Sequence, residues 1–250
     1  MSTNESPVST SSYSQVYETL LELIMDFKLK PFALISEKAL ADFLQVSRSP
    51  VREALARLST IGMVDIYAQR GTIVSPLRLE DLQHSQFLRE CVEVGLLTKV
   101  CQLSDRNALV KRLTDEISLQ ETLAGITDYK RFARSDELFH QYIASAASFT
   151  GIWSEISTAK LHMNRFRKLT YPDMDSLGVI IAQHRAIAEA IKAGNTTKAT
   201  KAMQKHLRKI FPLIPDLMSK FPQYFEKKKS DSSRFIHRPD LVNLNNPDQR

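Results

Sequence analysis

The feature that most constrains the fold of this chain is a helical periodicity that continues from residue 79 to about residue 219. Apolar residues recur there at three- and four-residue spacing, and only short groups of cap and turn residues interrupt them. Six such segments, each of about 20 residues, can bury their apolar faces only against one another. The sequence therefore predicts an antiparallel all-α bundle of six helices over most of the chain.

The turn residues set the expected limits of these helices. Gly194 and Asn195 supply a C-terminal glycine followed by an N-cap, and Pro212 and Pro215 should kink or shorten the last helix. Only 7 of 250 residues are glycine, and no glycine-rich phosphate-binding motif is present, which argues against a nucleotide-binding α/β fold. The expected helices cover residues 79–103, 105–124, 128–147, 151–170, 174–193 and 196–219.

The first 78 residues follow a different pattern, in which three shorter helices precede two short strands. The helices are expected to begin at residue 14, after an N-cap at Ser36 and after an N-cap at Ser49. Pro50 fits the first position of the third helix, and Gly62 ends it. The segments 64–67 and 72–74 have the composition of strands and form a hairpin. This order of elements is the plan of a winged helix-turn-helix.

The predicted fold is thus mainly α, with an N-terminal winged helix-turn-helix and a C-terminal helical bundle. The N-terminal residues lack a signal sequence, no segment is long enough to span a membrane, and Cys91 and Cys101 make no disulfide framework. We therefore expect a cytoplasmic protein without a membrane partner. The expected domains are a disordered N-terminus at 1–12, the winged helix at 13–76, the bundle at 77–224 and a disordered tail at 225–250.

Net charge does not by itself identify a DNA-binding segment in this chain. The whole chain has a formal charge of +6, but residues 1–78 contain as many acidic as basic side chains. Arg48 and Arg52 nevertheless lie at the N-terminal end of the third helix, which in a helix-turn-helix approaches base edges. A guanidinium can bond guanine O6 and N7 together, and Arg70-Gly71 at the hairpin tip suits a wing. The alternative is a helical hairpin whose arginines are merely solvated.

The same segment resembles a known family. The strings V-S-R-S-P-V-R-E-A-L-A-R-L, Gly62-Met63-Val64 and R-G-T-I-V, within about residues 14–76, resemble the winged helix-turn-helix of the GntR family of bacterial transcription regulators. The resemblance implies double-stranded operator DNA as the partner. It implies DNA contacts at Lys38, Arg48, Ser49, Arg52, Arg70 and Gly71, with Ser36 and Ser47 as phosphate contacts.

A second constellation lies in the predicted bundle and has the composition of a metal site. Asp136 and His140 are four residues apart and share a helix face, while His184 and His206 lie at similar depth on two antiparallel helices. Three imidazoles and one carboxylate suit a divalent ion such as zinc or nickel, or manganese. The alternative for each histidine is an ordinary capping or solvated side chain.

The surrounding strings S-D-E-L-F-H, A-Q-H-R-A-I-A-E-A-I-K-A-G-N and A-M-Q-K-H-L resemble the FCD effector-binding domain of one GntR branch, over about residues 80–220. The resemblance implies that Asp136, His140, His184 and His206 are the metal ligands, and six helices imply the VanR-like group. The chain departs from the family at Gln183, where glutamate is frequent, and at residues 148–151, where the family has a Ser-Gly-Asn-Pro turn.

Arg89 stands where this family has an arginine, and Glu93 follows it. An inward guanidinium beside a metal would bind a small carboxylate effector; the alternative is a surface ion pair between Arg89 and Glu93. We therefore expect a homodimeric transcription repressor controlled by a small organic acid, and not an enzyme. Two alternatives are a metal-responsive regulator without organic effector and a metallohydrolase with an appended DNA-binding module.

Overall fold

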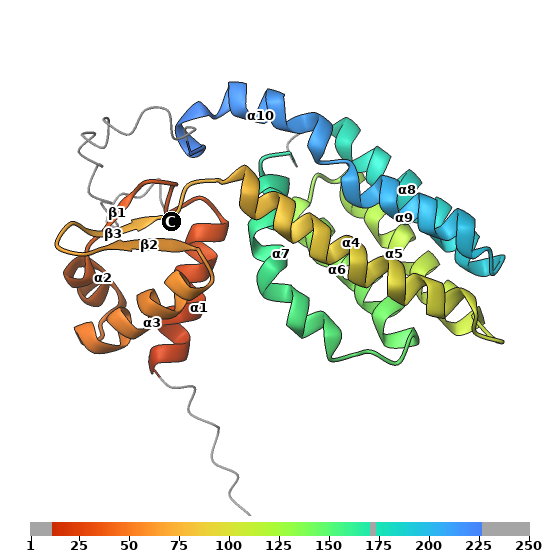
Figure 1. Ribbon diagram of the computed structural model, residues 1–250, viewed down its shortest axis with the longest axis horizontal. Helices are drawn as coiled ribbons and strands as arrows, with labels where there is room; N and C mark the ends of the chain where they lie inside the picture. Colours follow the sequence, from red (N-terminus) through yellow and green to blue (C-terminus); the bar gives the residue numbers. More distant parts are fainter. Residues whose placement is uncertain (1–11, 171–173, 227–250) are drawn as a thin grey trace, which may run out of the picture. The chain divides into compact units, whose positions relative to one another are not determined.

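The computed structural model describes residues 12–170 and 174–226, which form two compact units (Figure 1). The winged-helix unit contains residues 12–78 together with residues 221–226, and the helical bundle is Leu79–Lys220. The sequence placed the end of the bundle at residue 224, so the structure differs in assigning the last described residues to the first unit. No helix in the described ranges is long and apolar enough to cross a lipid bilayer.

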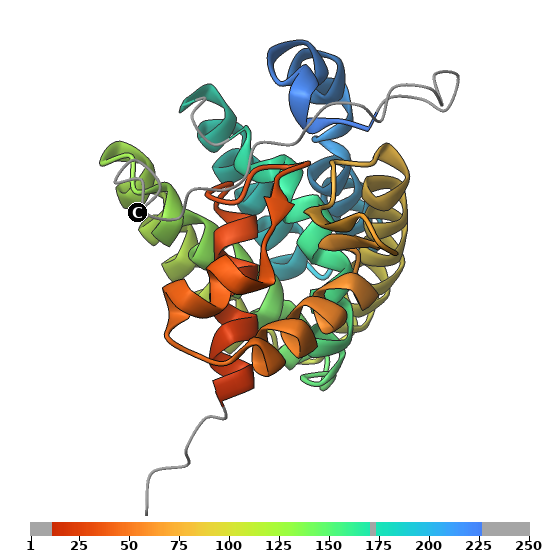
Figure 2. The ribbon, with the colours of Figure 1, turned by 90° about the vertical axis from the view of Figure 1, so that its left-hand side faces the viewer.

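Three helices build the core of the winged-helix unit: α1 (Ser12–Met25), α2 (Glu37–Leu44) and α3 (Arg48–Thr60). Figure 2 faces this unit, in which α1 packs along α3 and buries Leu20 and Leu55. The expected cap of the third helix was wrong, because Ser47 occupies the N-cap and Ser49 lies inside the first turn. Both serines suit a cap, and Pro50 is tolerated at the third position because its missing N–H would have no partner there.

The wing is a three-stranded antiparallel sheet in the order β1-β3-β2. Strands β2 (Val64–Tyr67) and β3 (Gly71–Val74) form the expected hairpin, with Tyr67 opposite Gly71. Strand β1 (Leu34–Ile35) was not expected. Two residues are too few to produce an alternating pattern, so only pairing with β3 identifies this strand.

The chain returns to the winged-helix unit at its end. Leu77 pairs with Phe225 in a parallel bridge, with hydrogen bonds from Leu77 N to Tyr224 O (2.8 Å) and from Glu226 N to Leu77 O (3.1 Å). The Tyr224 ring stacks on Phe27 at 5.3 Å between centroids. Pairing between such distant segments leaves no periodic signal in the sequence, which explains why residues 221–226 were expected elsewhere.

The bundle contains six long helices within the described residues, as the periodicity predicted. Phe132, Phe139 and Ile187 lie in its buried core. The last long helix ends at Arg208 instead of residue 219. It is followed by a 3-10 turn, η1 (Phe211–Leu213), and a short helix, α10 (Ile214–Lys220). The two prolines explain this break, because each lacks the N–H that a continuous helix needs. The long helices are α4 (Leu79–Cys101), α5 (Asn107–Gly125), α6 (Tyr129–Ala146), α7 (Ile152–Lys168), α8 (Met174–Lys192) and α9 (Thr196–Arg208).

Candidate functional site

The start of α2 presents one capping serine and one exposed lysine. Ser36 Oγ accepts a hydrogen bond from Ala39 N at 3.2 Å, which satisfies one of the unpaired amides at the start of the helix. The hydroxyl keeps its own hydrogen for donation. Lys38 is exposed in the first turn of the same helix. Both side chains thus remain able to meet a phosphate.

The first turns of α3 carry the side chains that the sequence singled out for DNA contact. Arg48, Ser49 and Arg52 are exposed, and Ser47 makes no capping hydrogen bond with its side chain. Arg52 Nη2 lies 3.0 Å from Glu37 Oε2, with 71% of the arginine side chain exposed. An ion pair so exposed contributes little to stability, because solvent screens the two charges. Exchanging Glu37 for another acceptor therefore costs the protein little.

The tip of the wing combines an exposed arginine with a backbone conformation that favours glycine. Arg70 is exposed in the turn between β2 and β3. Gly71 follows with φ +99°, and a Cβ atom there would lie 3.2 Å from Leu34 Cδ1. A side chain at position 71 would be strained and would also crowd β1.

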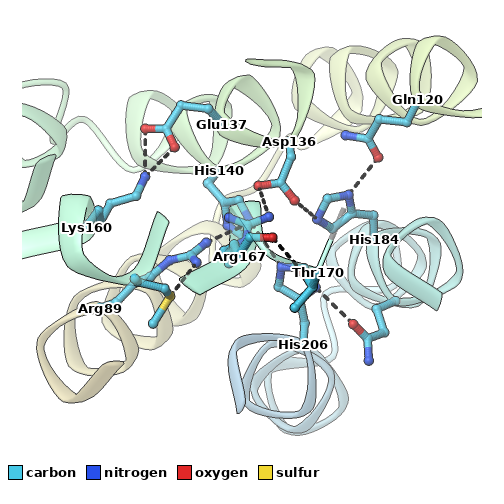
Figure 3. A network of polar contacts seen from close by, with 12 residues as sticks. Arg89, Gln120, Asp136, Glu137, His140, Lys160, Arg167, Thr170, His184 and His206 are labelled. Carbon is cyan, nitrogen blue, oxygen red and sulfur yellow. Dashed lines mark hydrogen bonds and ion pairs between the residues drawn. The ribbon is translucent and has the colours of Figure 1, made fainter. Parts of the chain in front are cut away.

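The four candidate metal ligands converge inside the bundle, where each is at most 2% exposed. Asp136 and His140 come from α6, His184 from α8 and His206 from α9 (Figure 3). One atom of each lies within 4.8 Å of the others. The distances are 3.2 Å between the Nε2 atoms of His140 and His206 and 3.6 Å between His184 Nε2 and Asp136 Oδ1. Tetrahedral zinc with bonds of about 2.1 Å separates its ligand atoms by about 3.4 Å.

Outer contacts orient all three imidazoles in the same way. His184 Nδ1 lies 2.8 Å from Gln120 Oε1, and His206 Nδ1 lies 3.1 Å from Gln183 Oε1. His140 Nδ1 lies 2.5 Å from Glu93 Oε2. The two amide oxygens act as acceptors, which places the hydrogen of His184 and of His206 on Nδ1 and leaves Nε2 with a lone pair. This is the outer-shell arrangement that orients histidines toward a metal.

Burial and charge hold His184, His206 and Asp136 in the protonation states that a cation requires. Burial lowers the pKa of His184 and of His206 well below the ordinary value, so both imidazoles are neutral. Burial alone would raise the pKa of Asp136, but the charge of Arg167, whose Nη2 donates to Asp136 Oδ2 at 2.7 Å, lowers it well below the ordinary value. Neutral imidazoles and an ionised carboxylate are the metal-binding forms.

Unpartnered buried atoms in the cluster also indicate that these residues suit a divalent cation. Among the described residues, Asp136 Oδ1 and His184 Nε2 are buried without a hydrogen-bond partner. The lone pairs of His140 Nε2 and His206 Nε2 also face each other across 3.2 Å. Buried polar atoms without partners are costly, and a cation held between the four residues would satisfy Asp136 Oδ1 and His184 Nε2.

Arg89 from α4 lies beside this cluster. Its Nε donates to Glu93 Oε1, its Nη2 lies 3.1 Å from His140 Nε2, and its Nη1 lies 3.4 Å from Met163 Sδ. Arg89 and Glu93 are both 2% exposed. The alternative of a surface ion pair was therefore wrong, because α4 turns this pair into the bundle. Burial would raise the pKa of Glu93, but chiefly the charge of Arg89 lowers it to about 2.

A buried lysine forms a second polar group next to the first. Lys160 Nζ contacts both carboxylate oxygens of Glu137 at 2.6 Å and lies 3.6 Å from the centroid of the Trp153 ring. Burial, and secondarily the charge of Arg89, lowers the pKa of Lys160 to about 8 despite its pairing with Glu137. Figure 3 shows this pair on the opposite side of His140 and Asp136 from His184.

A small cavity lies beside His206, between α4, α7 and the end of α9. Its volume of about 10 Å³ is roughly the space of one water molecule. Arg89, Arg167 and Lys209 line it together with the thioether of Met163. Burial, and secondarily the charge of Arg167, lowers the pKa of Lys209 to about 7. The described lining residues include three basic side chains and no carboxylate.

Sequence reasoning missed the outer residues of this site. Gln120, Lys160, Arg167 and Lys209 were not singled out, although each has a signal in retrospect. Gln120 continues the apolar stripe of α5, and Lys160 and Arg167 lie on the stripe of α7 that includes Met163. A long polar side chain on the buried face of an amphipathic helix needs a partner inside the fold. Such exceptions mark an internal polar site.

Comparisons with known proteins agree with this architecture. Residues 12–74 match the family described as bacterial regulatory proteins, gntR family, and residues 86–209 match the FCD domain. The chain is 34% identical over 210 residues to an uncharacterized HTH-type transcriptional regulator in an unstable DNA locus of Streptomyces ambofaciens, covering 84% of this chain and 88% of that protein. It is 23% identical over 214 residues to the HTH-type transcriptional repressor RspR of Escherichia coli K12, covering 86% and 93%.

Solved structures share the fold. Escherichia coli McbR/YncC superposes with a TM-score of 0.66 at 18% identity, covering 82% of this chain and 98% of that one. A putative transcriptional regulator GntR from Rhodococcus sp. RHA1 gives a TM-score of 0.63 at 23% identity, covering 87% and 100%.

A winged helix-turn-helix joined to a helical domain with a buried polar site defines a DNA-binding transcription regulator. The chain belongs to the GntR family of bacterial regulatory proteins and carries an FCD domain. Its relatives are regulators and not enzymes, so the alternative of a metallohydrolase is set aside.

Proposed function

We propose that this regulator binds operator DNA under the control of a small organic acid held at a divalent metal ion in the FCD domain. The observation that carries the proposal is the convergence of three Nε2 atoms and one carboxylate oxygen, each oriented from outside by another side chain. Asp136, His140, His184 and His206 would hold the ion, zinc or nickel by their donor set. Once bound, the ion supplies a Lewis-acidic position for an oxygen of the ligand.

Arg89 is the proposed partner of the ligand carboxylate. Nη2 of Arg89 donates to the one lone pair of His140 Nε2. If His140 ligates a cation, that lone pair is used, and Nη2 loses its acceptor. Among the described residues, Nη1 contacts only the weakly accepting sulfur of Met163. The free edge of the guanidinium then matches a carboxylate, so cation and organic acid should bind cooperatively.

On the DNA side, we propose that Arg48 and Arg52 contact base edges and that Arg70 reaches the minor groove beside Gly71. The exposed first turns of α3 and the exposed wing tip support these roles. The proposed further contacts, chiefly to phosphate, are Ser36, Lys38, Ser47 and Ser49.

We further propose a homodimer that reads a two-fold-symmetric operator. Phe87 of α4 is 73% exposed, and Leu88 and Cys91 are exposed beside it. Large exposed apolar groups on one helix face commonly lie at an interface. Replacing Phe87 by glutamate should yield a monomer in light scattering, whereas Ile126→Glu, at an exposed site on another segment, should not. A dimeric Phe87→Glu protein would contradict this interface.

Control of DNA binding requires that the ligand bind the DNA-competent and released states with different affinity, typically by about 1–3 kcal/mol. We expect the ligand to release the operator, the behaviour of a repressor. Fluorescence anisotropy of an operator fragment, titrated with organic acids in the presence of metal, measures this coupling. Affinity unchanged by any acid, but changed by adding and removing metal, would instead support the metal-responsive alternative. The small cavity beside His206 favours that second candidate.

Elemental analysis of the purified protein tests the metal site directly. The parent protein should contain about one divalent ion per chain, and the His184→Ala, His206→Ala double variant should contain none. His84→Ala is the matched control because His84 is exposed and lies outside the cluster. Equal metal content in the parent and the double variant would reject the site.

A further inference from the structure

The cavity beside His206 is lined by three basic side chains, of which only two have an acidic partner among the described residues. Arg89 is paired with Glu93, and Arg167 is paired with Asp136. Lys209 also lines the cavity, but within the described part of the chain it forms no ion pair or side-chain hydrogen bond. Lys209 is half-buried, and an ammonium that is partly removed from water without a counterion is destabilised.

We propose that the ligand of this domain is a small organic dianion, whose first acidic group meets Arg89 and whose second meets Lys209 and Arg167. This inference rests on the proposed function, because it assumes that the cavity belongs to the ligand site. It adds a second anion-binding position to that site and excludes monocarboxylates as the preferred ligands.

The chemistry of the lining separates the two positions. The Arg89 edge lies next to His140 Nε2, so a carboxylate bound there is adjacent to the candidate metal ligands. Lys209 follows the end of α9, one turn beyond His206, and thus provides a second cationic position on the same cavity. A monoanion at Arg89 would leave the Lys209 ammonium without a counterion.

The present volume of about 10 Å³ is too small for any organic acid, so binding must displace side chains. Met163 is the side chain best suited to move, because its thioether is flexible and holds Arg89 Nη1 only by a weak contact of 3.4 Å. Exchange of that sulfur for a carboxylate strengthens the interaction at Arg89 while it enlarges the cavity.

Calorimetric titration of the zinc-loaded full-length protein tests the proposal with matched ligands. Malonate, succinate and malate are compared with their half-amides, which keep the size and one carboxylate but lose one charge. Phosphoglycolate and glycolate form a further pair, which distinguishes a phosphate from a carboxylate as the second acidic group. At least one dianion should bind at least tenfold more tightly than its singly charged mate.

The Lys209→Met variant should lose this preference, because methionine keeps the length of the side chain but not its charge. Lys205→Met is the control, since Lys205 is exposed in the last turn of α9, just before Lys209. The melting temperature of the ligand-free protein should rise in Lys209→Met and stay unchanged in Lys205→Met. The melting temperature is measured without ligand, so this test does not depend on which organic acids are titrated.

These experiments distinguish failure of the dianion proposal from failure of organic-acid control. If singly charged acids bind as tightly as every dianion, or if Lys209→Met keeps the preference, the dianion proposal is overturned and the proposed function stands. If neither class binds the zinc-loaded protein while zinc itself is retained, organic-acid control fails together with the dianion proposal. A melting temperature that falls in Lys209→Met would contradict the absence of a counterion.

Discussion

Substitution of Gln120 probes the orientation of an imidazole at the candidate metal centre. Gln120 is fully buried, and its Oε1 lies 2.8 Å from His184 Nδ1. Its Nε2 has no hydrogen-bond partner within the described residues. If Oε1 accepts from Nδ1–H, Gln120→Glu keeps the acceptor and removes the orphaned N–H group, whereas Gln120→Leu removes the acceptor and keeps the volume.

The size of the effect follows from this one contact. A net hydrogen bond is worth about 0.5–1.5 kcal/mol, and loss of an outer-shell partner of a metal-bound histidine typically weakens metal binding about tenfold to hundredfold. We therefore expect Gln120→Leu to weaken zinc binding by about 1.4–2.7 kcal/mol at 25 °C. Gln120→Glu should keep the affinity of the parent within a few-fold.

Competition against a chromophoric chelator measures both affinities, and thermal unfolding of the metal-free variants shows that they remain folded. The opposite ranking would refute the reasoning. If the amide of Gln120 were instead the donor, a carboxylate could not replace it. Gln120→Glu would then bind zinc as weakly as Gln120→Leu, and His184 would carry its hydrogen on Nε2, where it cannot ligate a cation.

Three further predictions concern the two units separately. Arg52→Ala should weaken operator binding by about 1–3 kcal/mol without changing the melting temperature, because the ion pair of Arg52 with Glu37 is exposed. Arg57→Ala, at the far end of α3, is the control in the same anisotropy assay. An equal loss of operator affinity in both variants would contradict the role assigned to Arg52. Phe225→Ala should lower the free energy of unfolding of the winged-helix unit by about 3–5 kcal/mol, since the Phe225 side chain is buried at 4% exposure. Urea titrations measure this change. An unchanged urea midpoint would show that residues 221–226 do not stabilise this unit. The pKa of Lys160 is lowered to about 8 in the folded protein, whereas an unfolded lysine has a pKa of about 10.4. Between these two values the unfolded state binds more protons than the folded state, so the free energy of unfolding rises with pH. From pH 8.5 to 10, the parent should therefore gain stability relative to Lys160→Met by up to about 1.4 kcal/mol per pH unit. A gap that stays constant with pH, as expected for a Lys111→Met control at an exposed site, would contradict the burial of this ammonium.

The elements with many local signals were predictable from the sequence. The long helices of the bundle repeat their apolar spacing over many residues, and caps such as Asp128 and Asn195 form the hydrogen bonds that their residue types suggest. The hairpin of the wing follows from the turn at Gln69-Arg70-Gly71. Where two serines were equally suitable, as at Ser47 and Ser49, the local signal did not identify the cap.

The four candidate ligands were predictable for a related reason. Asp136 and His140 share a face through spacing alone, and the turn at Gly194-Asn195 brings His184 and His206 to the same depth. The partners that orient them come from helices distant in sequence: Glu93 from α4, Gln120 from α5 and Arg167 from α7. Periodicity places each of these on an inward face but says nothing of the side chain across from it.

By itself, the sequence determined which segments are helices, which faces of them are apolar, and where the DNA-reading motif and the four inward polar residues lie, because each of these depends on neighbours along the chain. Tertiary structure alone decided that Arg89 and Glu93 are buried, that Lys209 meets Arg89 and Arg167 at one cavity, and that the final described residues pair with Leu77. Those contacts join side chains separated by long stretches of chain. Their free energy depends on distance and burial in the folded state, and neither quantity exists before the helices have packed.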